Sequence, residues 1–308
     1  MAGALVGGPA VAASENIFYD HSARTRFRIG FDRWIGRLLP FLFIVALAPI
    51  IDLVYFITVR AWPILSFGNL TNTQPYANLN GDAVGIAVVG TFYVMAIATA
   101  FAVLLGLFGG IATAEFLTER AAGWIRMSAN MLAGTPSVVV GYFGYFAFVL
   151  YFGWGYSLIA GSLTLAFFMV PYTFRTVDLA FTSIPRGIRE AALGSGARAY
   201  QYIMKVATPI AFPQILTGVF LAMAIGVGET APIVLTTHTS LLLPNSLTSG
   251  VWFLTVTIYT GYNQPPGSNG LAQAFQAAFI IMAVVIALNI IVRVVAARYQ
   301  KRLEGLFQ

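Results

Sequence analysis

The amino-acid sequence predicts an all-α integral membrane protein with six transmembrane helices. Three observations lead to this fold class. Hydrophobic residues make up 58% of the 308 residues and charged residues only 9%, with a mean hydropathy of +0.80, a composition that soluble domains do not have. Six apolar segments each approach the ~20 residues that a helix needs to cross the hydrocarbon core. The positive charges gather on one side of these segments.

The first part of the chain, residues 1–37, is expected to be a cytoplasmic tail with a basic interfacial segment. Residues 1–23 are small and glycine-rich, which favours disorder. Arginines between positions 24 and 37 then alternate with apolar residues, a pattern typical of a segment that lies in contact with membrane lipid. A first transmembrane helix and an external loop are expected to follow over 38–83.

The six expected spans follow the apolar segments of the chain. Their bounds are 38–59, 84–111, 129–152, 157–182, 210–235 and 271–296. Fifteen of the 17 lysines and arginines lie on one side of these spans; only Arg60 lies on the other side, and Arg175 lies within a span. By the positive-inside rule this bias places both termini in the cytoplasm. Residues 84–297 then form the transmembrane core, 298–308 a cytoplasmic tail, and 236–270 a long external loop.

Prolines and glycines within the spans predict where helices bend and where they pack. Pro136, Pro171 and Pro232 each remove a backbone hydrogen bond, which is tolerated where the freed groups line a cavity or meet another helix. Glycines such as Gly106 and Gly110 allow two helices to approach closely. We expect packing to be the main role of these glycines.

The segment 183–213 is the longest polar-rich passage between two apolar segments. Pro185 suits the first turn of a short helix, Gly194-Ser195-Gly196 breaks that helix, and Pro209 marks where a second helical run must bend or stop. A helix, a glycine turn and a helix on one membrane face form a knob that can dock into a partner's cleft. The alternative is a solvated loop, but such a loop needs neither the paired glycines nor Ala191-Ala192.

The spacing within this segment resembles the EAA motif of ABC importer permeases. Glu190-Ala191-Ala192 is followed after three intervening residues by Gly196, and after nine more intervening residues by Val206-x-x-Pro209. The resemblance implies that Glu190, Ala191, Ala192, Gly196 and Pro209 belong to a cytoplasmic coupling helix region that receives the power stroke of an ATPase subunit. Thr208 stands where the family usually has leucine.

Three segments narrow the resemblance to the PstA-type permease of the phosphate importer: AGTPSVVVGYFGYF at 133–146, SIPRGIREAALGSGA at 183–197 and PQILTGVFLAMAIGVGETAPI at 213–233. The family implies the type I ABC importer permease (MetI-like) fold and the transport of inorganic phosphate. Ile225 departs from the family, which usually has an arginine four residues before the glutamate at 229.

The resemblance also implies the partners and the location. A homologous PstC-type permease would complete the translocation path, two PstB-type ATPase subunits would bind ATP and Mg, and a PstS-type extracytoplasmic protein would deliver phosphate. The complex would lie in the cytoplasmic (inner) membrane of a prokaryote. No cofactor is expected in this chain itself.

Several ionisable residues lie in apolar surroundings, where a charge at a helix centre costs ~2.5–3.5 kcal/mol and therefore faces a cavity or a partner. Arg175 and Asp178 are three residues apart on one helical face and can neutralise each other. Alternatively, Arg175 offers a forked donor set suited to an oxyanion, with the Thr230 hydroxyl as a further donor. Glu229 precedes the expected kink at Pro232, where it can form a gate. A substrate pathway or gate is thus expected at Arg175, Asp178, Glu229 and Thr230.

The absence of certain motifs limits the mechanism. There is no cysteine and no Gly-Lys-Ser/Thr phosphate loop, so the chain is not expected to hydrolyse ATP by that route or to be an enzyme. No metal site is expected. The net charge of +6 follows membrane topology and does not indicate nucleic-acid binding. Two alternatives remain: a permease for another oxyanion (molybdate, sulfate or a phosphonate), and an ion-coupled secondary carrier that uses Asp178 and Glu229. A membrane enzyme is a more distant one.

Overall fold

The computed structural model describes residues 23–74, 81–237, 240–265 and 268–304, and every regular element within these ranges is a helix. The chain divides into two units, one up to Phe56 and one from Ile57 onward. The elements are α2 (Ala23–Ala61), the 3-10 helix η2 (Trp62–Ile64), α3 (Phe67–Thr71), α5 (Gly85–Glu115), α6 (Glu119–Ala133), α7 (Ser137–Gly144), the π-helix η3 (Tyr145–Tyr151), α8 (Leu158–Thr182), α9 (Arg186–Gly194), α10 (Ala199–Tyr202), the π-helix η4 (Ile203–Ala207), α11 (Thr208–Val227), α12 (Ala231–Thr236), α13 (Leu254–Tyr262) and α14 (Gly270–Glu304).

Within the described residues, the first unit contains the helix α2 as far as Phe56, and the helix continues to Ala61. Its 39 residues run without a break between the basic segment and the expected first span, although Pro40 and Pro49 lie inside it. Large apolar side chains such as Phe41 and Phe43 are exposed along it, as suits a helix surrounded by lipid. The stretch 1–22, most of the segment that we expected to be disordered, lies outside the described residues.

Five described helices are long and apolar enough to cross a membrane, and a bent pair makes a sixth when it is counted as one span. The pair consists of α6 and the α7–η3 segment, which meet at an angle of 99°. This agrees with the prediction of six spans, but the third span was placed wrongly at 129–152. The helix begins at Glu119 and breaks at 134–136, because Pro136 has extended backbone (φ −55°, ψ 135°) and cannot continue α6.

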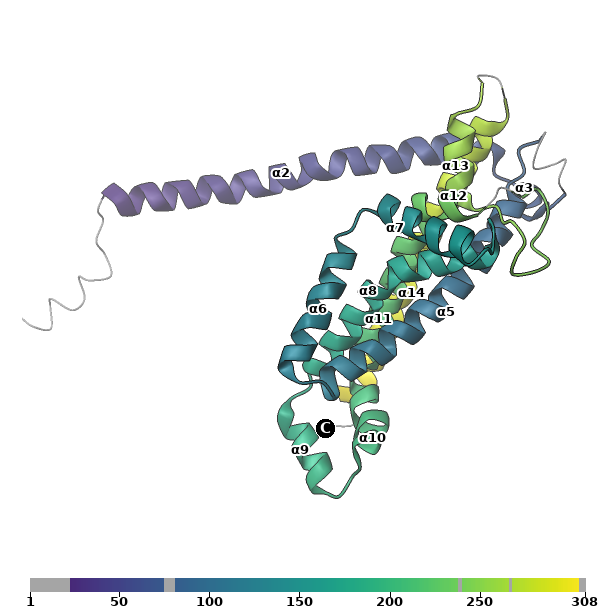
Figure 1. Ribbon diagram of the computed structural model, residues 1–308. Coiled ribbons are helices and arrows are strands. Elements are labelled where there is room, and N and C mark those ends of the chain that lie inside the picture. The colour runs from purple at the N-terminus through teal and green to yellow at the C-terminus, as the bar shows by residue number, and fades with distance from the viewer. Residues whose placement is uncertain (1–22, 75–80, 238–239, 266–267, 305–308) are drawn as a thin grey trace, which may run out of the picture. The chain divides into compact units, whose positions relative to one another are not determined.

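The second unit is built on the contact between α5 and α8 (Figure 1). Gly106 lies against Thr173 of α8, and Gly110, one turn later, lies against Val177. A Cβ atom on Gly110 would come within 2.7 Å of Val177 Cβ, so only glycine fits at this distance. The Thr173 hydroxyl donates to the carbonyl oxygen of Ala102 on α5 at 3.0 Å. The packing role predicted for these glycines is confirmed.

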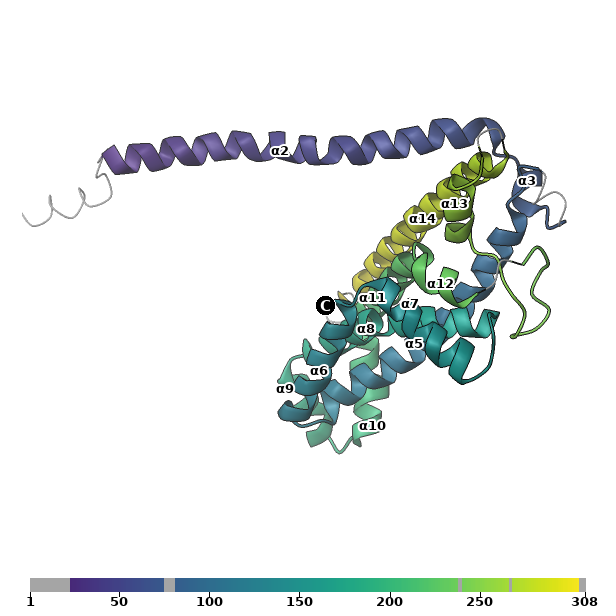
Figure 2. The ribbon, with the colours of Figure 1, turned by 45° about the horizontal axis from the view of Figure 1, so that its top comes forward.

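The segment 236–270 is not a simple external loop, as the sequence led us to expect. Within it Val251 and Phe253 are almost fully buried, and α13 follows with Leu254 and Val256 in the core. The hydroxyls of its threonines bond to backbone carbonyl oxygens of the same helix region: Thr257 donates to Phe253 and Thr260 to Val256. Figure 2 shows α13 beside α14, at the end of the unit opposite α9 and α10.

Pro209 does not stop or bend the helical run, contrary to prediction. The helix widens into the π-turn η4 just before it, and the N–H of Thr208 reaches back five residues to the Ile203 carbonyl. Pro209 then occupies the first turn of α11, where its missing N–H leaves no bond unmade in that helix. The chain therefore passes from α10 through η4 into α11 as one span, Ala199–Val227.

Candidate functional site

The helix α9 owes its sharp end to Gly196. The N–H of Gly196 donates to the Leu193 carbonyl at 3.0 Å, and the N–H of Ala197 donates to the Ala192 carbonyl at 3.2 Å. This pair of bonds is a Schellman motif, which requires the left-handed conformation at the residue after the cap. Gly196 has φ of +87°. The spacing between Ala192 and Gly196 is thus the spacing that this helix end demands.

The motif residues divide into an exposed and a packed part. Glu190 and Ala191 are exposed on α9, whereas Ala192 is half-buried and packs against a core cluster that includes Phe181 and Tyr202. Among the described residues Glu190 has no ion-pair partner. The helix therefore presents an unpaired carboxylate outward while its alanine side rests on the core.

An ion pair attaches α9 to the end of α5. Arg189 Nε lies 3.5 Å from Glu115 Oε2, and Arg189 Nη2 donates to the Glu115 carbonyl at 3.3 Å. The Glu115 side chain is only 6% exposed, and the buried Tyr202 of α10 lies beside it. The carboxylate of Glu115, the last residue of α5, thus contacts both α9, through Arg189, and α10, through Tyr202.

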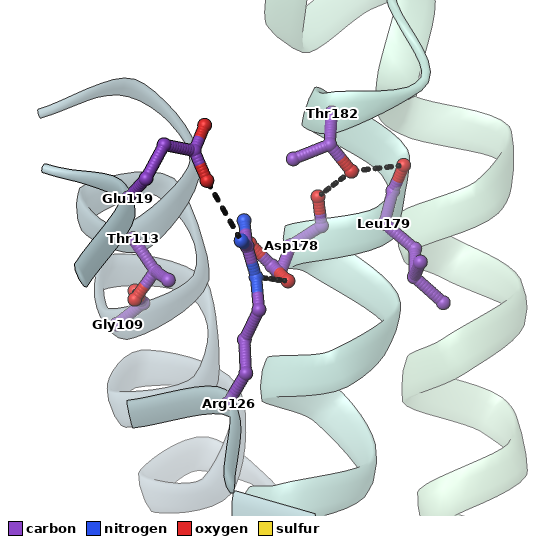
Figure 3. A network of polar contacts seen from close by, with 7 residues as sticks. All are labelled: Gly109, Thr113, Glu119, Arg126, Asp178, Leu179 and Thr182. Carbon is purple, nitrogen blue, oxygen red and sulfur yellow. Dashed lines mark hydrogen bonds and ion pairs between the residues drawn. The ribbon is translucent and has the colours of Figure 1, made fainter. Parts of the chain in front are cut away.

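A second ion pair joins α6 to α8. Arg126 Nε and Nη2 donate to the two carboxylate oxygens of Asp178 at 2.7 Å and 2.8 Å, a bidentate arrangement (Figure 3). The Asp178 side chain is 7% exposed and that of Arg126 33%. The exposed Glu119 lies 4.0 Å from Arg126 Nη1. The hydroxyl of Thr182 donates to the Asp178 carbonyl at 2.8 Å, one turn from the end of α8.

The expected pair between Arg175 and Asp178 is therefore wrong. Both residues lie on α8, but in the described part of the chain the Asp178 carboxylate is held by Arg126, and Arg175 is exposed. Arg126 lies between the expected spans 84–111 and 129–152, a position that suggests a loop charge and no partner on a helix. The signal was helical spacing: Arg126 follows Ala122, the only described residue of α6 that is buried, by four residues.

Glu229 and Thr230 lie in a break between α11 and α12. Thr255 of α13 donates from its hydroxyl to the Glu229 carbonyl at 2.8 Å, and the Glu229 carboxylate faces the hydroxyl of Ser137, the first residue of α7. Beside the break lies an open cavity of about 630 Å³, lined by residues that include Thr230 and Tyr259. Its wall is largely apolar, with hydroxyl and amide groups among the lining residues.

The predicted site residues thus fall into three separate places. The motif residues lie on α9 and after it, Asp178 pairs with α6, and Glu229 with Thr230 occupies the α11–α12 break. In the ranges that the structure describes, Asp178 and Glu229 have different partners and do not share a cluster. Glu190, Ala191, Ala192 and Gly196 thus lie on α9 and at its end, and Pro209 lies in α11. Of the expected pathway residues, Arg175 and Asp178 share α8, and Glu229 and Thr230 lie at the α11–α12 break.

The fold is an all-helical membrane core with a bent span, a broken helix and an exposed helix–glycine–helix segment. The chain belongs to the family described as "Binding-protein-dependent transport system inner membrane component", whose model matches residues 102–304. It is accordingly a multi-pass inner-membrane permease component of an ABC transporter and not the catalytic component. This assignment sets aside the ion-coupled secondary carrier and the membrane enzyme.

Similar proteins refine the assignment. The chain is 34% identical over 259 residues to the phosphate transport system permease protein PstA 2 of Mycobacterium bovis, covering 82% of this chain and 83% of that protein. It is 31% identical to PstA of Haemophilus influenzae, covering 75% of this chain and 81% of that protein. An inward-facing structure of the MetNI methionine ABC transporter matches with a TM-score of 0.55 and 18% identity, covering 70% of this chain and 96% of that one. The structural match confirms the predicted MetI-type fold.

Permeases of this class work with an ATPase, which binds the ATP, and with a binding protein that delivers the substrate. Because the ATP site belongs to that partner, the present chain is expected to contribute a conformational change and not a chemical reaction. It must present a path for the substrate and a surface that receives the movement of the ATPase.

Proposed function

We propose that this chain is the permease subunit of an ATP-driven importer of inorganic phosphate, with α9 as its coupling helix. The similarity to PstA proteins supports phosphate as the cargo. The observation that carries the coupling role is the exposed, unpaired Glu190 on a helix whose opposite side is fixed to the core by Ala192 and Arg189. Such a helix can receive a push at its outer face and pass it inward.

The partners follow from the same proposal. A PstC-type permease completes the path, two PstB-type ATPase subunits dock below, and a PstS-type protein delivers phosphate from outside. Both termini and α9 lie in the cytoplasm, since the positive charges favour that side. Alternating access then proceeds by rigid-body movement around a central path.

The substrate pathway is proposed to run past the break at Glu229 and Thr230. The break frees backbone groups, a cavity of about 630 Å³ opens beside it, and Thr230 and Thr255 are among the residues that line that cavity. Arg175 remains the candidate cation for the anion because it is exposed on α8 and takes no part in the ion pairs of the described residues. We no longer assign Asp178 to the pathway, because its carboxylate is bound by Arg126.

The coupling role is tested by reversing one charge. Glu190→Lys is expected to abolish co-purification of the ATPase subunit and phosphate uptake while the chain still inserts into the membrane, because an exposed side chain is replaced without loss of packing. The matched control is Asp82→Lys, the same type of reversal just before α5, at the end of that helix opposite α9. It is expected to leave ATPase binding intact. Normal binding and uptake by the Glu190 variant would contradict the coupling role.

The cargo is tested separately by competition. Uptake of radiolabelled phosphate by the reconstituted complex is expected to fall with excess unlabelled phosphate and to persist with excess molybdate, sulfate or a phosphonate. Equal competition by one of these oxyanions would overturn phosphate as the preferred cargo and leave the permease assignment standing.

A further inference from the structure

Two ion pairs cross between the same two helix–turn–helix segments. One segment is α5, the turn 116–118 and α6; the other is α8, the turn 183–185 and α9. Arg189 of α9 pairs with Glu115 at the end of α5, and Arg126 of α6 pairs with Asp178 near the end of α8. Each turn therefore has an ion pair on either side of it, and the pairs tie each helix of one segment to a helix of the other.

The Arg126–Asp178 pair is the principal polar attachment of α6. Only Ala122 of that helix is buried among the described residues, whereas Trp124 and Met131 are 65% and 64% exposed. A helix with so little buried surface is weakly held by packing. The bidentate bond to Asp178 fixes both its distance from α8 and its rotation.

A movement of α6 can be transmitted to the break between α11 and α12 through the helix α7. Through the bend at Pro136, α6 leads into α7, whose first residue Ser137 faces the Glu229 carboxylate. The α12 helix that follows Glu229 packs against α7. The helix α9 is thus connected through α5, α6 and α7 to the break in the proposed pathway.

We propose that Arg126–Asp178 and Arg189–Glu115 are positioning contacts that make α6 move with the coupling helix α9 as one body. The inference rests on the proposed coupling role of α9 and adds the means by which its movement reaches the Glu229 break. Together the two ion pairs and the two turns connect α5, α6, α8 and α9 in a closed ring, which we call the frame. When α9 is displaced, the end of α5 moves with it because Arg189 is bound to Glu115. The helix α6 moves as well, because Arg126 is bound to Asp178 on α8.

The frame is tested by a distance measurement in the complete complex. Spin labels are placed on Gly123→Cys of α6 and Gly187→Cys of α9, since a Cβ at either position meets no atom within 4 Å and the chain has no cysteine of its own. Cysteines in the partner subunits are removed. The distance between the labels is measured by pulsed electron resonance without nucleotide and in the ATP-trapped state. It is expected to stay the same in both states.

The ion pair is then removed without stranding a charge. In Arg126→Gln with Asp178→Asn, α9 moves without α6, so the label distance is expected to change with nucleotide. The phosphate transported per ATP hydrolysed should fall about fivefold or more, while the ATPase subunit still co-purifies. The charge exchange Arg126→Asp with Asp178→Arg should recover the coupling ratio. Glu119→Gln serves as control, because its side chain is 93% exposed, and is expected to behave as the wild type.

The outcomes separate this inference from the coupling role itself. A label distance that changes with nucleotide in the otherwise wild-type chain overturns the frame, even if every variant fails to assemble. A double variant that keeps both the distance and the coupling ratio overturns it as well. If Glu190→Lys binds the ATPase normally, the coupling role fails instead, whatever the labels show.

Discussion

Gly196 shows how one backbone angle can fix a motif position. Its φ of +87° lies in the left-handed region, and a Cβ there would meet no neighbouring atom. The requirement for glycine therefore comes from the backbone alone and not from crowding. Because the Schellman bonds to Ala192 and Leu193 depend on that angle, the direction in which the chain leaves α9 depends on it too.

Comparison of Gly196 with Gly187, which lies within α9, isolates this effect. Gly196→Ala is expected to cost ~1–2 kcal/mol at the end of α9 and to lower co-purification of the ATPase subunit several-fold. Gly187→Ala is the matched control, since its Cβ also meets nothing within 4 Å but its φ is negative. It should bind the ATPase as the wild type does. Equal behaviour of the two variants, measured by co-purification, would show that the left-handed angle is unimportant.

At the scale of elements, the contact between α5 and α8 combines two kinds of close approach. Gly106 and Gly110 admit the side chains of Thr173 and Val177, and the Thr173 hydroxyl bonds across to the α5 backbone. Lipid supplies no hydrophobic force between helices, so close packing and interhelical hydrogen bonds must hold this pair together.

Enlarging one of these glycines should therefore separate the two helices. Gly110→Val is expected to destabilise the core by ~1–3 kcal/mol through overpacking, because its Cβ would lie 2.7 Å from Val177 Cβ. Gly123→Val on α6 is the control at an open helical position. Thermal unfolding of the purified subunit in detergent is the measurement. The packing argument is wrong if both variants unfold at the same temperature.

At the scale of the whole molecule, the orientation in the membrane is the remaining proposal. Single cysteines at Ala191 and Ser268 can be probed in intact cells with a membrane-impermeant thiol reagent, because the chain has no cysteine to interfere. We expect only the Ser268 variant to react, since the proposed orientation places α9 in the cytoplasm. Permeabilised cells should label the exposed Ala191 position as well. Labelling at Ala191 in intact cells contradicts the orientation.

The sequence was sufficient for the fold class and for the helix–glycine–helix segment, since both depend on local composition and spacing. It failed where tertiary contacts decide. Arg126 resembles a loop charge until α8 places Asp178 opposite it, and Thr257 resembles a loop residue until its hydroxyl is seen to bond within α13. The bend at Pro136 was located, but the start of α6 was not, because α6 carries charged residues that a long apolar span lacks.

The π-turn at Ile203–Ala207 has a consequence for chain length. Such a turn holds one residue more than the α-helix it interrupts. Removing a single residue there would leave an unbroken helix leading into α11, and would rotate everything before it by about 100° about the helix axis. The face of α9 that carries Glu190 would then point elsewhere, with every motif residue still present. The orientation of the proposed coupling helix α9 thus depends on residue count as well as on residue identity.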